Sequence, residues 1–564
     1  MMTNALRLIH TSFHRVFFGI LFIFGFWALM DQSLADSYFG KNGDVTAQIG
    51  VRYPVRPVPP GKVGWGAMWK KDILFPKPPT NFSNASHQAY IRQLAEVNLP
   101  LVREADMRNI SWPWGVSYST WGVNWENSAL PWSERPMDCV RFPGRVSTWC
   151  EKTIVGVGDL VTLADIWGLE AVTVAVPLAV IDGSRVRWGP GFFDQVFSPA
   201  LIETISDHAK AEIDFMKQQP GWARLQRVYI EAGTEWRHFK LKNPSPAVLS
   251  YAALIKRIRE KIDDPKVIVV ASAADGADIP GVKATQTASW NKYLYRELKG
   301  IPGIALDLHR YRGTKGAKQG PNSTTPMSPQ NIDALLKTGL GQRSYLTVQP
   351  NMQWPGGIGG AMPTVLLENA IHGYGSDHGS RSTQPWPWPV VMAHADLTRE
   401  ALASDAMTFL GWTWFPETLP KEWPHGAIRN GELSKHAKAQ GFLSRYHRGM
   451  VLSTSISDEN AVRGVASSQN GVVHYYGGNF SRVPHRLNVI LRGKNNNNAQ
   501  VEIMTEFGVS TRNWQGYQSL DLPPMSLFRI RFEGTGGSVL PKKPKKSVPV
   551  RGYRTKKPRS GQIR

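Results

Sequence analysis

Two glutamates near the ends of strand-like segments are the residues of this chain best suited to paired acid–base chemistry. Glu235 closely follows the apolar segment 225–232 and stands beside Trp236, and Glu368 follows the apolar segment 363–367. Two carboxyl groups on one rim can cleave a glycosidic bond, because one protonates the leaving oxygen while the other attacks the anomeric carbon. An apolar neighbour raises the pKa of a carboxylic acid, so we expect Glu235 to be the acid/base and Glu368 the nucleophile.

Six further residues near predicted strand ends could bind a sugar. An arginine and a tyrosine beside Glu368 would lower the pKa of its carboxyl group, as a nucleophile requires. Aromatic rings offer broad apolar faces on which a sugar ring can stack, and a threonine hydroxyl can hydrogen-bond a sugar hydroxyl. The predicted substrate-binding residues are Arg103, Thr234, Trp236, His309, Tyr311 and Trp412.

Strand-like and helix-like segments alternate between residues 62 and 415, which is the pattern of a parallel α/β architecture. Eight strand–helix repeats fit a (β/α)8 TIM barrel, whose active site lies at the carboxyl ends of the strands. The segment 345–348 competes with 363–367 for the seventh strand. The expected strands span 62–69, 99–105, 169–176, 225–232, 266–272, 303–308, 363–367 and 411–415, and the expected helices span 86–97, 157–167, 199–217, 246–262, 286–298, 329–339 and 398–410.

Beyond residue 440 the pattern changes to short alternating strands separated by Gly, Asn and Ser. Such strands predict an all-β sandwich, which the early strand-like stretch at 45–58 is expected to join. The predicted organisation is a signal peptide at 1–35, N-terminal strands at 36–60, a catalytic barrel at 61–430, a β-sandwich at 440–535 and a disordered basic tail at 536–564.

The beginning of the chain indicates export. Basic residues precede an apolar run at 16–30, and small residues at 33–35 offer a cleavage site, as in a secretory signal peptide. The run is shorter than the roughly 20 residues of a membrane span, and an uncleaved anchor is the alternative. We therefore expect a periplasmic or extracellular protein.

The C-terminal tail carries nearly half of the net positive charge. The formal net charge is +22, and residues 541–564 contain ten Lys or Arg and no acidic residue. Such a tail cannot bury apolar surface and is expected to be disordered. In an exported protein it favours an anionic envelope surface or an acidic polysaccharide over nucleic acid as a partner. A solubilising tail without a partner is the alternative.

Other motifs argue against metal and cofactor chemistry. The glycine-rich stretch 356–360 lacks the lysine and the serine or threonine of a phosphate loop, and His372 and His378 match no strong metal-ligand spacing. Cys139 and Cys150 favour a disulfide in an exported protein. The hydrophobic content of 42% and the charged content of 20% are those of a globular protein. We predict no metal and no cofactor.

The segment from Tyr229 to Glu235 resembles the strand-four signature of clan A glycoside hydrolases, especially their arabinofuranosidases and β-xylosidases. That signature contains an aromatic residue, a glutamate, an apolar residue, glycine, asparagine and the acid/base glutamate. This chain has Thr234 where the family has asparagine, which changes how the sugar 2-hydroxyl is held. The resemblance covers residues 45–535. By position it implies Glu235 as acid/base, Glu368 as nucleophile, Arg103, His309 and Tyr311 as their supports, and Glu231 as a buried carboxylate behind the site.

These observations predict a secreted or periplasmic retaining glycoside hydrolase that cleaves a polysaccharide, with an acidic chain favoured by the positive charge. A non-catalytic glycan-binding protein of the envelope or of an exopolysaccharide machinery is the alternative, because Thr234 departs from the signature. An envelope scaffold held by the basic tail is a third hypothesis.

Overall fold

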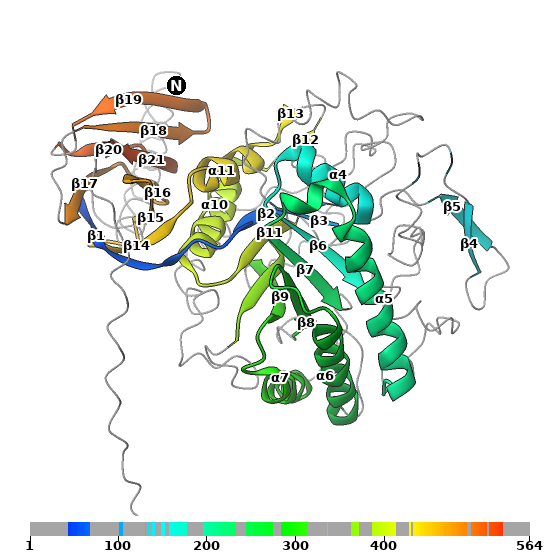
Figure 1. Ribbon diagram of the computed structural model, residues 1–564. Helices are drawn as coiled ribbons and strands as arrows, with labels where there is room; N and C mark the ends of the chain where they lie inside the picture. Colours follow the sequence, from blue (N-terminus) through cyan, green and yellow to red (C-terminus); the bar gives the residue numbers. More distant parts are fainter. Residues whose placement is uncertain are drawn as a thin grey trace, which may run out of the picture.

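Eight parallel strands close into a barrel, and a nine-stranded sheet lies beside it (Figure 1). The computed structural model describes residues 43–67, 101–104, 130, 134, 137–141, 148–152, 157–176, 196–232, 244–273, 284–312, 336, 362–371, 386–412, 428–429, 432–492, 498–515 and 518–533. In the order in which they pair around the barrel, its strands are β10 (Thr364–Ile371), β11 (Thr408–Trp412), β2 (Val63–Ala67), β3 (Leu101–Glu104), β6 (Ala171–Val176), β7 (Arg227–Ala232), β8 (Val267–Ser272) and β9 (Ile304–Arg312).

The barrel strands form where β-branched and small apolar residues run together. All six residues of β8 are buried, as expected for a parallel strand that is covered on both faces. Val269 and Ala271 pack outward into the core shared with the helices, whereas Ile268 and Val270 join a smaller cluster inside the barrel. The two-residue alternation of a strand therefore divides the barrel into an outer core and an interior.

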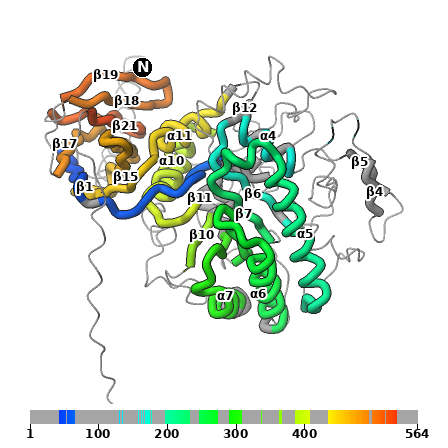
Figure 2. Tube along the Cα trace, viewed as in Figure 1, coloured from blue at the N-terminus to red at the C-terminus, as the bar shows by residue number. Residues whose placement is uncertain are grey.

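The described helices cover the outside of the barrel (Figure 2). One of them begins at Pro199, where the Ser198 hydroxyl accepts a hydrogen bond from the backbone N–H of Leu201 (3.2 Å). Its stripe of apolar residues, which includes Ile205 and Ile213, is buried. The helices are α4 (Val157–Trp167), α5 (Pro199–Lys217), α6 (Pro244–Lys261), α7 (Ala284–Leu298), α10 (Trp388–Ala403) and α11 (Lys435–Ser444), with a short 3-10 helix, η4 (Pro220–Ala223).

The nine-stranded sheet includes a strand from the beginning of the chain. The strand β1 (Asp44–Pro57) pairs antiparallel with β14 and parallel with β17. One core joins strands far apart in the sheet, such as β17 through Leu487 and β18 through Val501. The remaining strands are β14 (Met450–Ile456), β15 (Val462–Gln469), β16 (Val472–Asn479), β17 (His485–Arg492), β18 (Ala499–Thr505), β19 (Gly508–Trp514), β20 (Leu520–Leu522) and β21 (Ser526–Phe532).

The helix α10 joins the barrel to the sheet, and nearly all of its residues are buried. Asp396 on this helix accepts a hydrogen bond from Arg399 (Nε–Oδ1, 2.9 Å) and forms an ion pair with Arg463 of β15. The Trp388 ring nitrogen donates to the backbone oxygen of Met525 (2.6 Å). The two parts are therefore connected by buried polar contacts in addition to apolar packing.

Two small hairpins complete the described structure. In the first, β4 (Met137–Arg141) pairs with β5 (Thr148–Lys152) and sets Cys139 opposite Cys150. The predicted disulfide between these cysteines stays a prediction. The second hairpin joins β12 (Ile428–Arg429) to β13 (Glu432–Leu433).

Four predicted elements differ from the structure. The strand expected at 411–415 begins earlier, at Thr408. The strand expected at 303–308 continues to Arg312, and the strand expected at 363–367 continues to Ile371, because hydrogen-bonded pairing extends beyond the apolar run. The predicted helix at 398–410 is wrong: α10 ends at Ala403 and β11 begins at Thr408. The chain leaves the helix at Ser404, whose extended backbone stops the helical hydrogen bonds.

The mixed α/β class is confirmed, and the finer architecture is confirmed only in part. The strands form a closed ring, while helices are described between β3 and β9 and between β10 and β11, so the complete (β/α)8 assignment stays a prediction. The two-sheet sandwich is not confirmed, because the described strands form one continuous sheet. The signal peptide, the basic tail, the helix predicted at 86–97 and the competing strand 345–348 lie outside the described residues, and Leu336 alone is described from the helix at 329–339.

None of the helices that the structure describes is long and apolar enough to cross a membrane.

Candidate active site

The carboxyl ends of the barrel strands meet at one rim, where backbone register brings predicted site positions together. Trp412 of β11 is paired with Gly66 of β2, and Gly66 is paired with Arg103 of β3. Arg103 is paired in turn with Thr173 of β6. Trp412 and Arg103 thus lie at the same level with one strand between them.

Glu368 of β10 and His309 of β9 occupy directly paired positions, and Tyr311 is paired with Ala370 two residues further on. The register shifts between Val365 and Glu368, which indicates a β-bulge in β10. Bulges re-aim the residues that follow them and are frequent next to active sites. Sequence reasoning expected all three site residues just after their strands, whereas they lie within them.

The other predicted catalytic residue follows β7. This strand ends at Ala232, and Glu235 lies outside the described residues together with Thr234 and Trp236. For Arg103, His309, Tyr311, Glu368 and Trp412 the structure describes the backbone but not the side chains.

Within the barrel, polar side chains lie at and below the level of this rim. Thr173, Tyr229, Glu231 and Asp307 are all fully buried. Thr173 and Tyr229 are directly paired, and neither hydroxyl has a hydrogen-bond partner among the described residues. Burial raises the pKa of Tyr229, which is therefore a neutral hydroxyl at physiological pH. A buried hydroxyl without a partner costs about 1–3 kcal/mol, so these positions stay polar at the expense of stability.

From these residues the sequence analysis named Tyr229 and Glu231, both as part of the strand-four signature, and the Glu231 carboxylate is buried as the resemblance implied. Thr173 and Asp307 were missed. Each interrupts an otherwise apolar run, Thr173 in AVTVAV and Asp307 in IALDL, and such an interruption is the signal that could have found them. Across the described ranges, no group of three or more His, Cys, Asp or Glu residues is arranged to hold a metal ion.

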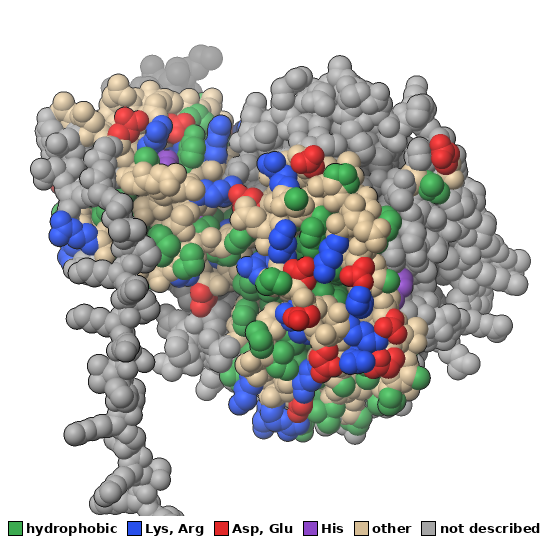
Figure 3. Space-filling model, viewed as in Figure 1, with side chains coloured by type: hydrophobic (Ala, Val, Ile, Leu, Met, Phe, Trp, Pro, Cys, Tyr) green, Lys and Arg blue, Asp and Glu red, His purple; other side chains and the backbone are tan. Residues whose placement is uncertain are grey.

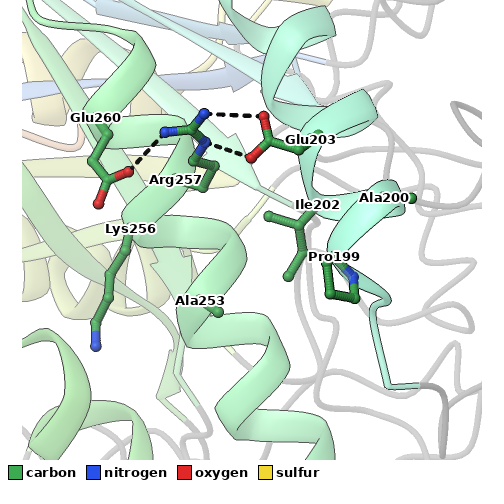
Figure 4. A pocket seen from close by; sticks show the side chains of 8 residues that line it. All are labelled: Pro199, Ala200, Ile202, Glu203, Ala253, Lys256, Arg257 and Glu260. Atoms are coloured by element: carbon green, nitrogen blue, oxygen red, sulfur yellow. Dashed lines mark hydrogen bonds and ion pairs between the residues drawn. The ribbon is translucent and has the colours of Figure 1, made fainter.

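A surface groove of about 510 Å³ lies between α5 and α6, on the outside of the barrel (Figure 4). Arg257 donates to both oxygens of Glu203 (2.6 and 3.0 Å) and to Glu260 (3.1 Å). These hydrogen bonds and those from Lys261 lower the pKa of Glu203 to about 2. Acidic and basic side chains alternate over this face of the molecule (Figure 3). Since no barrel strand lines the groove and its charges are paired, we assign it a structural role.

Three solved structures share the architecture of this chain. The α-L-arabinofuranosidase of glycoside hydrolase family 51 from Thermotoga petrophila RKU-1 superimposes with a TM-score of 0.57 at 12% identity, covering 87% of this chain and 100% of its own. The family 51 arabinofuranosidase from Xanthomonas axonopodis pv. citri gives a TM-score of 0.55 at 13% identity, with coverage of 87% and 100%. CelM2, a bifunctional glucanase-xylanase from a metagenome library, gives 0.51 at 14% identity, with coverage of 87% and 99%.

Neither a protein-family model nor a curated protein matches the sequence. At identities this low, the structural likeness establishes the fold and not the activity. The chain therefore has the fold of the family 51 α-L-arabinofuranosidases, which confirms its resemblance to clan A glycoside hydrolases at the level of the fold.

Proposed function

We propose that this protein is a retaining glycoside hydrolase that cleaves a polysaccharide, with Glu235 as acid/base and Glu368 as nucleophile. The observation that supports the proposal most is the backbone pairing of Glu368 with His309 at the barrel rim. The strand β7 ends three residues before Glu235 and belongs to the same barrel. The fold adds support, because solved structures that share it are described as arabinofuranosidases and as a glucanase-xylanase.

The proposed reaction has two steps. Glu235 protonates the leaving oxygen while Glu368 attacks the anomeric carbon, which forms a covalent glycosyl-enzyme. Glu235 then removes a proton from water, which attacks the same carbon and releases Glu368. Arg103, His309 and Tyr311 are proposed to donate to the nucleophile, Thr234 to a sugar hydroxyl, and Trp236 and Trp412 to stack on sugar rings.

The test compares Glu235→Gln and Glu368→Gly with the unmodified protein on 4-nitrophenyl glycosides, the α-L-arabinofuranoside and the β-D-xyloside first. Each variant is expected to lose at least about 100-fold in kcat. Azide is expected to restore turnover, giving a glycosyl azide of retained configuration with Glu235→Gln and of inverted configuration with Glu368→Gly. Glu203→Gln, from the outer groove, is the control and should keep full activity. Unchanged turnover in Glu368→Gly contradicts the proposed nucleophile.

A crystal structure offers a test without a substrate. Retaining enzymes hold their two carboxyl groups about 5–5.5 Å apart, whereas inverting enzymes hold them about 6.5–9.5 Å apart. We expect the shorter separation between Glu235 and Glu368. The longer one would contradict the retaining mechanism, and a still larger one would contradict the assignment of Glu368.

The second candidate is a non-catalytic glycan-binding protein. The observation that favours it is Thr234, which stands where the resembled signature has asparagine. In that case the unmodified protein binds polysaccharides in affinity gel electrophoresis but turns over no glycoside. Turnover that Glu235→Gln abolishes while binding persists would reject this candidate.

The organisation predicted from the sequence belongs to the same proposal. We propose an exported protein with a signal peptide at 1–35, N-terminal strands at 36–60 that join a β-sandwich at 440–535, a (β/α)8 barrel at 61–430 and a disordered basic tail at 536–564. Mass spectrometry of the exported protein tests cleavage near residue 35. Removal of residues 541–564 should weaken binding to anionic vesicles or an acidic polysaccharide and leave the cleavage of small glycosides unchanged. Loss of both functions would instead favour a scaffold held by the tail.

A further inference from the structure

A buried tyrosine stands between the ends of β7 and β8. Tyr251 of α6 is fully buried, and its hydroxyl donates to the backbone oxygen of Ala232 (2.7 Å) and accepts from the backbone N–H of Ser272 (2.9 Å). Ala232 is the last residue of β7, and Ser272 is the last residue of β8. One side-chain oxygen thus bridges two strands at the rim.

The Tyr251 hydroxyl occupies the place where the next direct backbone hydrogen bond between β7 and β8 would form. The amide of Val228 donates to the backbone oxygen of Lys266 (2.9 Å), and the pairing runs as far as Glu231 opposite Val270. In a parallel ladder these bonds recur at every second residue. The next bond would run from the Ser272 amide to the Ala232 oxygen, and the Tyr251 hydroxyl stands between those two atoms.

The neighbouring pair of strands has no such insertion. The Ala273 amide just beyond β8 donates directly to the backbone oxygen of Asp307 in β9 (3.1 Å). On the other side, β7 stays paired with β6 up to Val176 opposite Ala232. Of these three adjacent edges of the described barrel, only the β7–β8 edge is opened by a side chain.

The tyrosine is itself held in place by α7. Its ring lies 5.5 Å from the ring of Trp290, with an interplanar angle of 33°. The Trp290 ring nitrogen donates to the backbone oxygen of Ser272 (3.0 Å), and Trp290 is buried. The two aromatic residues therefore anchor the end of β8 through both its amide and its carbonyl group.

We propose that Tyr251 is a positioning residue that holds the end of β7 away from β8 and thereby sets the direction in which the chain leaves toward Glu235. The inference rests on the proposed function for its catalytic consequence, whereas its structural part does not. The Tyr251 hydroxyl stands between the Ser272 amide and the Ala232 oxygen, so its loss is expected to let these two groups pair directly, as the parallel ladder would. That closure shifts the segment with Glu235.

Crystal structures of the unmodified protein and of Tyr251→Phe test the structural part without any substrate. In the variant, the Ser272 nitrogen and the Ala232 oxygen are expected to approach to about 2.9–3.0 Å, with displacement of Glu235. An unchanged separation and an unmoved Glu235 would overturn the proposal. This outcome stands whether or not the protein proves to be a glycosidase.

Kinetics on whichever 4-nitrophenyl glycoside the unmodified protein cleaves test the catalytic consequence. Tyr251→Phe is expected to lower kcat by about 10- to 100-fold with KM within a factor of two, as for a misplaced catalytic group. The alkaline limb of the pH profile should shift, because the carboxyl environment changes. Tyr475→Phe, at a fully buried tyrosine of β16, is the matched control and should keep both kcat and the profile. Unchanged kcat in Tyr251→Phe despite a closed ladder would overturn the proposal.

Discussion

Asn479 in the nine-stranded sheet and Thr173 in the barrel are both fully buried polar residues, but their hydrogen bonding differs. The Asn479 amide donates to the backbone oxygens of Val483 (2.8 Å) and Pro523 (3.0 Å), and its oxygen accepts from Ser481. The Thr173 hydroxyl has no such partner in the described part of the chain. The first polar group fixes a turn, whereas the second lies at the level of the predicted catalytic rim. The contrast distinguishes buried polar groups that stabilise the fold, such as the Asn479 amide, from buried polar groups that stay available to a site, such as the Thr173 hydroxyl.

The largest effect is expected where the two regions meet. Asp396→Asn removes the charge that two buried arginines, Arg399 and Arg463, share. It should lower the free energy of unfolding by about 3–5 kcal/mol, since an uncompensated buried charge is left behind. Urea denaturation measures this loss. The control is Asp214→Asn, at an exposed ion pair with Lys210, where about 0.5 kcal/mol or less is expected. An equal loss of unfolding free energy in both variants would show that the buried ion pairs of Asp396 do not stabilise the contact between the barrel and the sheet.

A smaller effect tests the contrast itself. Asn479→Ala should lower the free energy of unfolding by about 2–3 kcal/mol, because it removes several buried hydrogen bonds and leaves their partners unsatisfied. Thr173→Val removes a buried hydroxyl that has no partner among the described residues, so it should raise the free energy of unfolding by about 1–3 kcal/mol. Thermal or urea unfolding of the two variants side by side decides the matter. A loss for Thr173→Val as large as that for Asn479→Ala would remove the distinction between the two regions.

The smallest effect concerns a buried lysine near the start of the barrel. Lys62 donates to the backbone oxygens of Ser404 (3.0 Å) and Ala406. Burial, together with the nearby Arg56, lowers the pKa of Lys62 to about 7, although Asp405 acts in the opposite direction. Between about pH 7 and pH 10 the unfolded chain therefore binds more protons at this site than the folded one, so its contribution makes stability rise with pH by up to about 1.4 kcal/mol per unit.

Lys62→Met should remove this dependence. The measurement is the free energy of unfolding of both proteins at about pH 7.5 and about pH 9, where the difference between them should change by about 1–2 kcal/mol. If the free energies of unfolding of the unmodified protein and of Lys62→Met change with pH in parallel, the lowered pKa of Lys62 is contradicted.

Much of the barrel could be predicted because its strands are short, apolar and rich in β-branched residues. The helices at 157–167 and 199–217 were found at their observed limits, since apolar stripes and a Ser-Pro start mark them. The helix α10 was misplaced, because its burial on all sides removes the period on which the prediction relies. Pro387 and Pro389 also read as breaks, although proline is tolerated in the first helical turn.

The candidate site could be predicted only as a set of positions. Alternation and apolar runs locate Glu368 near the end of a strand, but the bulge in β10 that sets Glu368 opposite His309 comes from pairing between segments far apart in sequence. Tyr251 carries no sequence signal of its role at all, because it reads as one more apolar position of a helix. Its function depends on two strand ends that the sequence does not bring together.

The position of β1 between β14 and β17 brings strands from before and after the barrel into one sheet. Of the strands that the structure describes, β1 is synthesised first, and it stays without its two neighbours until residues 450–492 have been made. The sheet therefore cannot be completed during early elongation. Cutting the chain after the barrel does not release an independent C-terminal unit either. Without β1, the order of strands breaks into a six-stranded piece and the pair β17–β20. The chain therefore joins the same sheet both before and after it forms the barrel, through β1 on one side and through β14 to β21 on the other.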